Sequence, residues 1–116
     1  MKKSLQPAGV ASAVTGFRLF LDLVRDRAPE VRKVLYLAIH PSPSDEPLRP
    51  FIDAANAGLR RLCAASRLAL FVDYLHLLLD PSGRPLPSRF QSDGLHFAPS
   101  LYRDLAAFLR PMLNPV

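Results

Sequence analysis

Two apolar segments, each too short for a typical helix, most strongly limit what this chain can fold into. Residues 34–39 (VLYLAI) and 68–72 (LALFV) run apolar without the alternation of a strand that has one face in water. Runs of this length are typical of parallel strands that are buried on both faces. A helical pattern separates them, from residue 48 to about residue 65. Strand, helix and strand in that order predict a right-handed parallel crossover.

Two further helices are expected on either side of this unit. Apolar residues recur every three or four positions from about residue 10 to 27, and Pro29 ends the pattern. An amphipathic closing helix begins at Pro99. The proline-rich segments 40–47 and 80–92 have the composition of loops. The sequence therefore predicts an α/β fold.

The two strands cannot form a stable sheet by themselves. Both are too apolar to be edges that face water, and an independently stable sheet needs three or more strands. We therefore expect one of two arrangements. Either another chain covers the strand edges, by self-association or as a separate polypeptide, or the 116 residues are the later part of a larger parallel-sheet domain.

Charge and cysteine content exclude several classes of protein. Cys63 is the single cysteine, which rules out an internal disulfide and a cysteine-based zinc site, and we expect it to be a small core residue. The net charge is +5, and residues 1–33 hold +4 of it, from seven basic and three acidic residues. Because this excess lies on an N-terminal tail and one helix face, we favour a solvated face over a nucleic-acid site.

The hydropathy pattern bears on the cellular compartment. No apolar run approaches the roughly 18 residues that suggest a membrane span. The basic start, Met1-Lys2-Lys3, resembles the charged end of a signal peptide, but Pro7 and Gly9 interrupt the segment after it. We therefore expect a soluble, cytoplasmic protein.

The segment before the closing helix carries the strongest chemical signal. Asp93 and His96 are three residues apart, on a turn that Gly94 makes possible. At this spacing a carboxylate reaches the near imidazole nitrogen and fixes the tautomer, while the far nitrogen stays free to act as a base. Taken alone, the pair is more often a surface histidine beside a turn aspartate than part of a catalytic triad.

The order of motifs resembles the C-terminal half of the SGNH (GDSL-type) hydrolases. The likeness is carried by VLYLAIHPSP at 34–43, Asn56-Ala57, Phe71-Val72-Asp73, LDPSGRP at 79–85, DGLHF at 93–97 and a following helix with Tyr102. It covers about residues 10–114. The resemblance implies a three-layer, flavodoxin-like α/β fold with a parallel sheet whose N-terminal strands are missing here. It divides the chain into a tail at 1–9 and the C-terminal portion of an SGNH hydrolase-like domain at 10–116.

The resemblance also implies a reaction. In that family the histidine of the DGLHF-type block is the general base of a serine esterase or lipase, which gives His96 that role and Asp93 the role of orienting it. The family's nucleophilic serine and oxyanion-hole residues lie in earlier blocks that have no matching position here. We therefore expect a truncated ester hydrolase domain that is inactive alone and meets an ester substrate only if a separate N-terminal half completes it.

Other candidate residues have structural interpretations. Ser42 and Ser44 follow a strand but lack the glycine-flanked turn of a nucleophile, so we interpret them as loop residues. We expect Ser92 to hydrogen-bond the turn, Asp73 to cap or orient a loop, and Asn56 to bind a loop. His40, His76 and His96 are too scattered for a metal site, and we expect no cofactor.

Two alternatives to an ester hydrolase domain remain at this point. The first is a catalytically inactive α/β module that pairs through its strand edges, with itself as a homo-oligomer or with a separate N-terminal half. The second is a basic nucleic-acid binder, which the location of the charge makes the weakest of the three.

Overall fold

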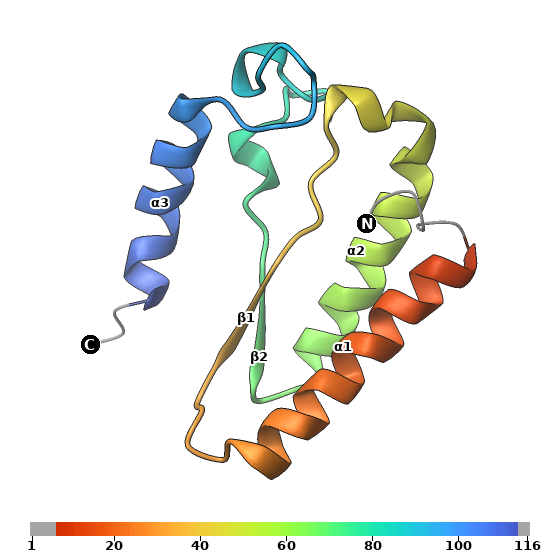
Figure 1. Ribbon diagram of the computed structural model, residues 1–116, viewed down its shortest axis with the longest axis vertical. Helices are drawn as coiled ribbons and strands as arrows, with labels where there is room; N and C mark the ends of the chain where they lie inside the picture. Colours follow the sequence, from red (N-terminus) through yellow and green to blue (C-terminus); the bar gives the residue numbers. More distant parts are fainter. Residues whose placement is uncertain (1–6, 114–116) are drawn as a thin grey trace. The chain divides into compact units, whose positions relative to one another are not determined.

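The structure, a computed structural model, describes residues 7–113 as a mixed α/β fold with a two-stranded parallel sheet and three α-helices (Figure 1). In chain order the elements are α1 (Pro7–Arg27), β1 (Val34–Leu37), the 3₁₀ helix η2 (Pro43–Leu48), α2 (Arg49–Ala64), β2 (Ala69–Val72), the 3₁₀ helices η3 (Leu75–Leu77) and η4 (Pro87–Arg89), and α3 (Pro99–Leu113). Helix α1 begins three residues earlier than its apolar pattern predicts, because proline suits the first turn of a helix. Residues 1–6 of the expected tail lie outside the described residues.

The chain divides into two compact units. Unit 1 consists of the chain up to Ile39 together with Pro47–Val72, and unit 2 consists of His40–Glu46 together with the chain from Asp73 onward. None of the helices within residues 7–113 is long and apolar enough to cross a membrane.

The sheet of unit 1 has the predicted parallel pairing. Val34 lies opposite Ala69 and Leu37 lies opposite Val72, and α2 makes the connection between the two strands. Helices α1 and α2 run side by side next to the strands (Figure 1). Their buried residues, among them Phe17, Leu59 and Cys63, form one core with Tyr36, Phe71 and other residues of one sheet face. Cys63 is thus a core residue, as expected, and burial raises the pKa of its thiol.

The other face of the sheet differs from the sequence-based expectation. The apolar runs predict burial on both faces, but Leu37 and Leu70 remain 37% and 42% exposed. The physical reason is that both helices of unit 1 pack against the face that carries Tyr36 and Phe71. The uniformly apolar sequences therefore predict the two strands correctly. They do not show whether other residues of this chain cover both faces of those strands.

Asn56 holds the end of β1. Its Oδ1 accepts a hydrogen bond from the N–H of Ile39 at 2.8 Å, and its Nδ2 donates to the carbonyl of Ile39 at 2.8 Å. One buried side chain on α2 thus satisfies both peptide groups of a residue that lies beyond the β1–β2 ladder. The expectation that Asn56 binds a loop is confirmed.

Unit 2 also contains buried apolar residues, some of them in the segment before α3. Its buried apolar residues are Tyr74, Leu78, Phe90, Phe97 and Leu101. Burial raises the pKa of Tyr74 to about 12. The guanidinium of Arg89 in η4 lies 2.7 Å from the carboxylate of Asp104 in α3, which ties the loop to the closing helix.

We expect Asn56→Ala to lower the free energy of unfolding by about 1–3 kcal/mol, because it leaves the N–H and the carbonyl of Ile39 without their partners. Urea denaturation followed by circular dichroism measures the change. Arg61→Ala, at an exposed position of the same helix, is the control and should cost no more than about 0.5 kcal/mol. Equal effects of the two substitutions would contradict the role given to Asn56.

Candidate active site

The loop between η4 and α3 is folded back on itself by backbone and side-chain hydrogen bonds. Phe90 and Phe97 form an isolated antiparallel bridge at its base. The N–H of Gln91 donates to the carbonyl of His96 at 2.7 Å, and Nε2 of Gln91 donates to the carbonyl of Phe97 at 3.1 Å. At its tip Gly94 has a φ of 67°, a conformation that glycine adopts without strain. The loop thus returns the chain so that residue 96 lies beside residue 93.

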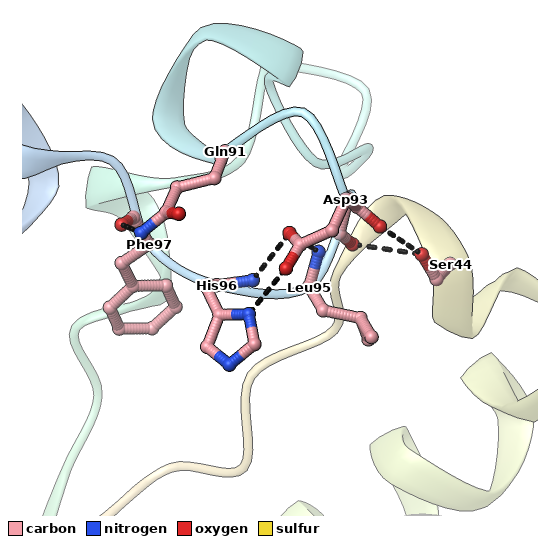
Figure 2. Close-up of polar contacts among 7 residues, drawn as sticks. Ser44, Gln91, Asp93, Leu95, His96 and Phe97 are labelled. Atoms are coloured by element: carbon pink, nitrogen blue, oxygen red, sulfur yellow. Dashed lines mark hydrogen bonds and ion pairs between the residues drawn. The ribbon is translucent and has the colours of Figure 1, made fainter.

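Asp93 accepts three hydrogen bonds within this loop (Figure 2). Its Oδ1 accepts hydrogen bonds from the backbone N–H groups of Leu95, at 2.9 Å, and of His96, at 3.1 Å. Its Oδ2 contacts Nδ1 of the His96 ring. The side-chain bond to His96, followed by the two backbone bonds, lowers the pKa of Asp93 to about 2. Asp93 is therefore a carboxylate at any pH near neutrality.

This carboxylate determines which nitrogen of His96 can act. An ionised carboxylate only accepts hydrogen bonds, so Nδ1 must carry the proton of the neutral ring, which leaves the lone pair on Nε2. Figure 2 shows the second ring nitrogen pointing away from Asp93. The side chain of His96 is 69% exposed, so Nε2 is accessible. The contact that the three-residue spacing predicts is present, whereas a catalytic role for the pair stays a prediction.

Ser44 supports the same loop from the segment after β1. Its hydroxyl lies 3.0 Å from the carbonyl of Gly94 and 3.2 Å from that of Asp93, and its N–H donates to the carbonyl of Gly94 at 3.3 Å. A side chain at residue 94 would meet this hydroxyl, because a Cβ built there lies 2.9 Å from Oγ of Ser44. The contact explains why the tip of the loop is a glycine.

Ser42 also has a structural role, in the loop after β1. It is buried, and both its N–H and its hydroxyl donate to Oδ2 of the buried Asp45. The hydroxyls of Ser42 and Ser44 are therefore engaged in holding loops, in agreement with their interpretation as loop residues. The 3₁₀ helix η2 and the buried carboxylate of Asp45 differ from the expectation, since the proline-rich sequence indicates only a loop.

A small apolar hollow lies beside His96. It has a volume of about 150 Å³ and is lined by His40, Leu95, His96, Phe97 and Tyr102. The ring of His40 meets that of Phe97 edge to face, with centroids 4.5 Å apart. Nothing in the sequence signals that His40 lies near this hollow, because the two histidines are far apart in the chain and no local pattern relates them.

A larger surface hollow of about 630 Å³ includes Asp73, His76 and Asp80. The side chains of Asp73 and Asp80 accept hydrogen bonds from residues of the turns in which they lie. Asp73 accepts the N–H of Leu75 at 3.2 Å and so orients the loop after β2, one of the two roles expected for it. Bonds from Ser82 and Arg84 lower the pKa of Asp80. Within residues 7–113 no group of histidine, cysteine, aspartate or glutamate side chains is arranged to hold a metal ion.

Comparison with known proteins bears on the fold alone. No family model matches the sequence, and no curated protein matches it. A solved structure from Streptococcus pneumonia, named "a putative platelet activating factor", has a similar fold, with a TM-score of 0.74 at 21% identity. The alignment covers 90% of this chain and 52% of that one, so this chain spans about half the length of that protein. At this identity the similarity shows the fold alone.

We expect the carboxyl of Asp93 to titrate near pH 2, and His96→Ala to raise its pKa toward the usual 3.8, because the largest cause of the low value is lost. The backbone bonds from residues 95 and 96 keep part of the shift. Since the pKa is lowered in the folded state, the stability that Asp93 contributes is present above about pH 4 and is lost as the pH falls toward 2. Carbon-13 NMR of the carboxyl group measures the titration.

Asp80 is the internal control for this titration. Its partners are Ser82 and Arg84, so His96→Ala should leave its pKa unchanged. An Asp93 pKa that is ordinary in both proteins, or that moves together with that of Asp80, would contradict the assigned cause.

We expect Gly94→Ala to destabilise the protein by at least about 1–2 kcal/mol, because alanine strains a backbone with positive φ and its Cβ crowds Ser44. Gly16→Ala is the matched control: it lies within α1 with open space around it, so the same substitution should stabilise by about 0.5–1 kcal/mol. Thermal unfolding of both variants distinguishes these signs. A stabilising Gly94→Ala would show that the tip of the loop tolerates a side chain.

Proposed function

We propose that this chain carries the acid–base part of an SGNH-type serine ester hydrolase, with His96 as the general base and Asp93 as the residue that positions it. The observation that carries the proposal is the contact between Asp93 and Nδ1 of His96, which leaves Nε2 as the ring nitrogen that faces away from the carboxylate on an exposed side chain. The proposal includes the flavodoxin-like form of the fold, of which the described residues make the β1–α2–β2 part and the closing helix.

The chemistry follows from the two ring nitrogens. Nε2 of His96 takes the proton of a serine hydroxyl while the serine oxygen attacks the ester carbonyl carbon. The same nitrogen then gives the proton to the oxygen of the departing alcohol. Asp93 stays ionised throughout, because its pKa of about 2 lies far below neutrality, and it stabilises the imidazolium that forms between the two steps.

The nucleophile is proposed to lie on a segment that completes the fold. Ser42 and Ser44 are engaged in loop hydrogen bonds, and Ser42 is buried. The similar fold in the Streptococcus pneumonia structure occupies about half of a longer chain, which is compatible with such a further segment. The exposure of His96 agrees with this proposal, since a catalytic base is most effective where further elements exclude water.

A second candidate is an α/β module without catalytic activity that pairs through its strand edges. The two-stranded sheet of the described residues favours it, because a sheet of two strands is stabilised when further strands pair with its edges. The two candidates differ in whether function depends on Nε2 of His96. The ester hydrolase requires this nitrogen as a base, whereas the pairing module does not.

Ester hydrolysis by a completed protein tests the proposal. We expect the 116-residue chain alone to show no labelling by a fluorophosphonate and no turnover of p-nitrophenyl acetate that depends on a serine. Joined to the polypeptide encoded immediately upstream of the Met1 codon, it should hydrolyse the ester, and His96→Gln should lower kcat by a factor of about 10³. His76→Gln, which changes an exposed histidine outside the site, is the control and should leave kcat unchanged.

Two results would contradict the proposal. One is labelling of the 116-residue chain that Ser42→Ala or Ser44→Ala removes, since the nucleophile would then lie within it. The other is an extended chain whose turnover is unaffected by His96→Gln, or an upstream region that supplies no active extension.

A further inference from the structure

A hollow of about 390 Å³ lies between α1 and α2, beside the point where the two helices pack most tightly. A Cβ at Gly58 would lie 2.8 Å from Cγ2 of Val14, so the glycine permits this close approach. The walls of the hollow come from both helices: α1 supplies Val10 and Val14, and α2 supplies Ala54, Gly58 and Leu62. We call this hollow the α1–α2 groove.

Two arginines line the α1–α2 groove, Arg18 from α1 and Arg61 from α2. Nη2 of Arg61 lies 3.9 Å from the Cβ position of Gly58, so this guanidinium folds back toward the wall of the groove. Both arginines are exposed, and neither has a hydrogen bond or an ion pair within residues 7–113. Their donors are therefore available to a ligand.

The two arginines lie at a similar level along the groove. Val14 contacts Gly58, and Arg25 donates to the hydroxyl of Ser66 at 3.0 Å, so the two helices run in the same direction (Figure 1). Arg18 follows Val14 by four residues and Arg61 follows Gly58 by three, which is about one helical turn in each case. Both cations thus lie toward the same end of the groove.

The acidic side chains of the two helices do not balance these cations. Each of the three carboxylates of α1 and α2 forms an ion pair with another arginine: Asp22 with Arg25 at 3.1 Å, Asp26 with Arg27 at 3.4 Å, and Asp53 with Arg49 at 2.9 Å. The positive charge of the α1–α2 groove is therefore complementary to an anion. Guanidinium groups suit a carboxylate in particular, because its two oxygens accept several N–H donors.

The rest of the lining selects what the anion is attached to. Apart from the two arginines, the described residues that line the groove are valine, leucine, alanine and glycine, and none of them is aromatic. A nucleotide base would find no ring on which to stack. An alkyl chain, in contrast, can bury its methylene groups against these side chains.

The volume of the groove limits the size of the ligand. At about 30 Å³ for each water-sized group, 390 Å³ corresponds to about a dozen such groups. A carboxylate on a chain of about ten carbons has this size. A helix of a partner protein is about 10–12 Å wide, so it would place only a few side chains in the groove.

We propose that the α1–α2 groove binds a soluble anionic amphiphile, with a carboxylate head group on a single alkyl chain of about ten carbons. The head group lies between Arg18 and Arg61, and the chain extends along the groove toward Val10 and Ala54. The inference concerns unit 1 alone, so it is independent of ester hydrolysis and of His96.

The probe for the test is sodium decanoate, added below its micelle concentration to the full 116-residue chain. The NMR amide signals of Val14, Gly58 and Leu62 should shift and reach saturation, whereas that of Phe97 in unit 2 should not move. Octanoate should bind about five to ten times more weakly, because it buries two fewer methylene groups. Added salt should weaken the binding of both, since it screens the arginines.

Two further probes separate the charge from the chain. Decanol has the same chain without a charge, and decyltrimethylammonium carries the opposite charge. Each should bind at least about tenfold more weakly than decanoate, because neither can pair with Arg18 and Arg61.

Matched variants assign the binding to the groove. Arg18→Gln and Arg61→Gln should each weaken decanoate binding about threefold to fivefold. Arg32→Gln removes the same charge at an exposed position outside the groove and should leave binding unchanged. Ala54→Phe fills the groove and should weaken binding at least about tenfold. Its control is Ala57→Phe, at an exposed position of α2 that does not line the groove. Circular dichroism reports that each variant keeps its fold.

Several outcomes would overturn the proposal. They are the absence of a saturable shift at the groove, decanol or decyltrimethylammonium binding as tightly as decanoate, and equal decanoate binding by wild type, Arg61→Gln and Ala54→Phe. Binding to phosphatidylglycerol vesicles that depends on Arg18 and Arg61, without binding of decanoate, would also overturn it, because the two arginines would then contact a membrane surface.

Discussion

The parallel pairing of β1 with β2 requires the chain to cross from one end of the sheet to the other, and α2 makes that crossing. The crossing brings Asn56 to the end of β1, where its amide binds both peptide groups of Ile39. It also means that both segments of unit 2, which begin at His40 and Asp73, follow the carboxyl end of a strand in the chain. In parallel α/β sheets these ends are where functional loops arise.

The candidate site is built almost entirely by local structure. Gly94 supplies the positive φ, the backbone N–H groups at 95 and 96 bind one carboxylate oxygen of Asp93, and the imidazole takes the other. Ser44 is the contribution from a distant part of the sequence. Such a loop can form the oriented histidine without the rest of a catalytic centre, so the geometry of the pair and the activity of the chain are separate questions.

This division explains what the sequence could predict. The contact between Asp93 and His96 was predictable, because spacing and a glycine determine it within four residues. The strands and their parallel order were predictable from apolar runs and the intervening helical pattern. The exposure of Leu37 and Leu70 was not, since it depends on which face the helices cover. Neither the buried Ser42–Asp45 bond nor the position of His40 beside His96 has a local signature, because tertiary packing creates both.

The proposed role of His96 depends on one state of its ring, in which Asp93 holds the proton on Nδ1 and Nε2 is free to act as a base. Nitrogen-15 NMR of the imidazole ring, recorded on the neutral form of the ring, measures this state directly. We predict a protonated Nδ1 and an unprotonated Nε2 in the wild-type chain, and a loss of this preference in Asp93→Asn. A ring protonated on Nε2, or one that averages between the two tautomers in the wild-type chain, would contradict the assignment.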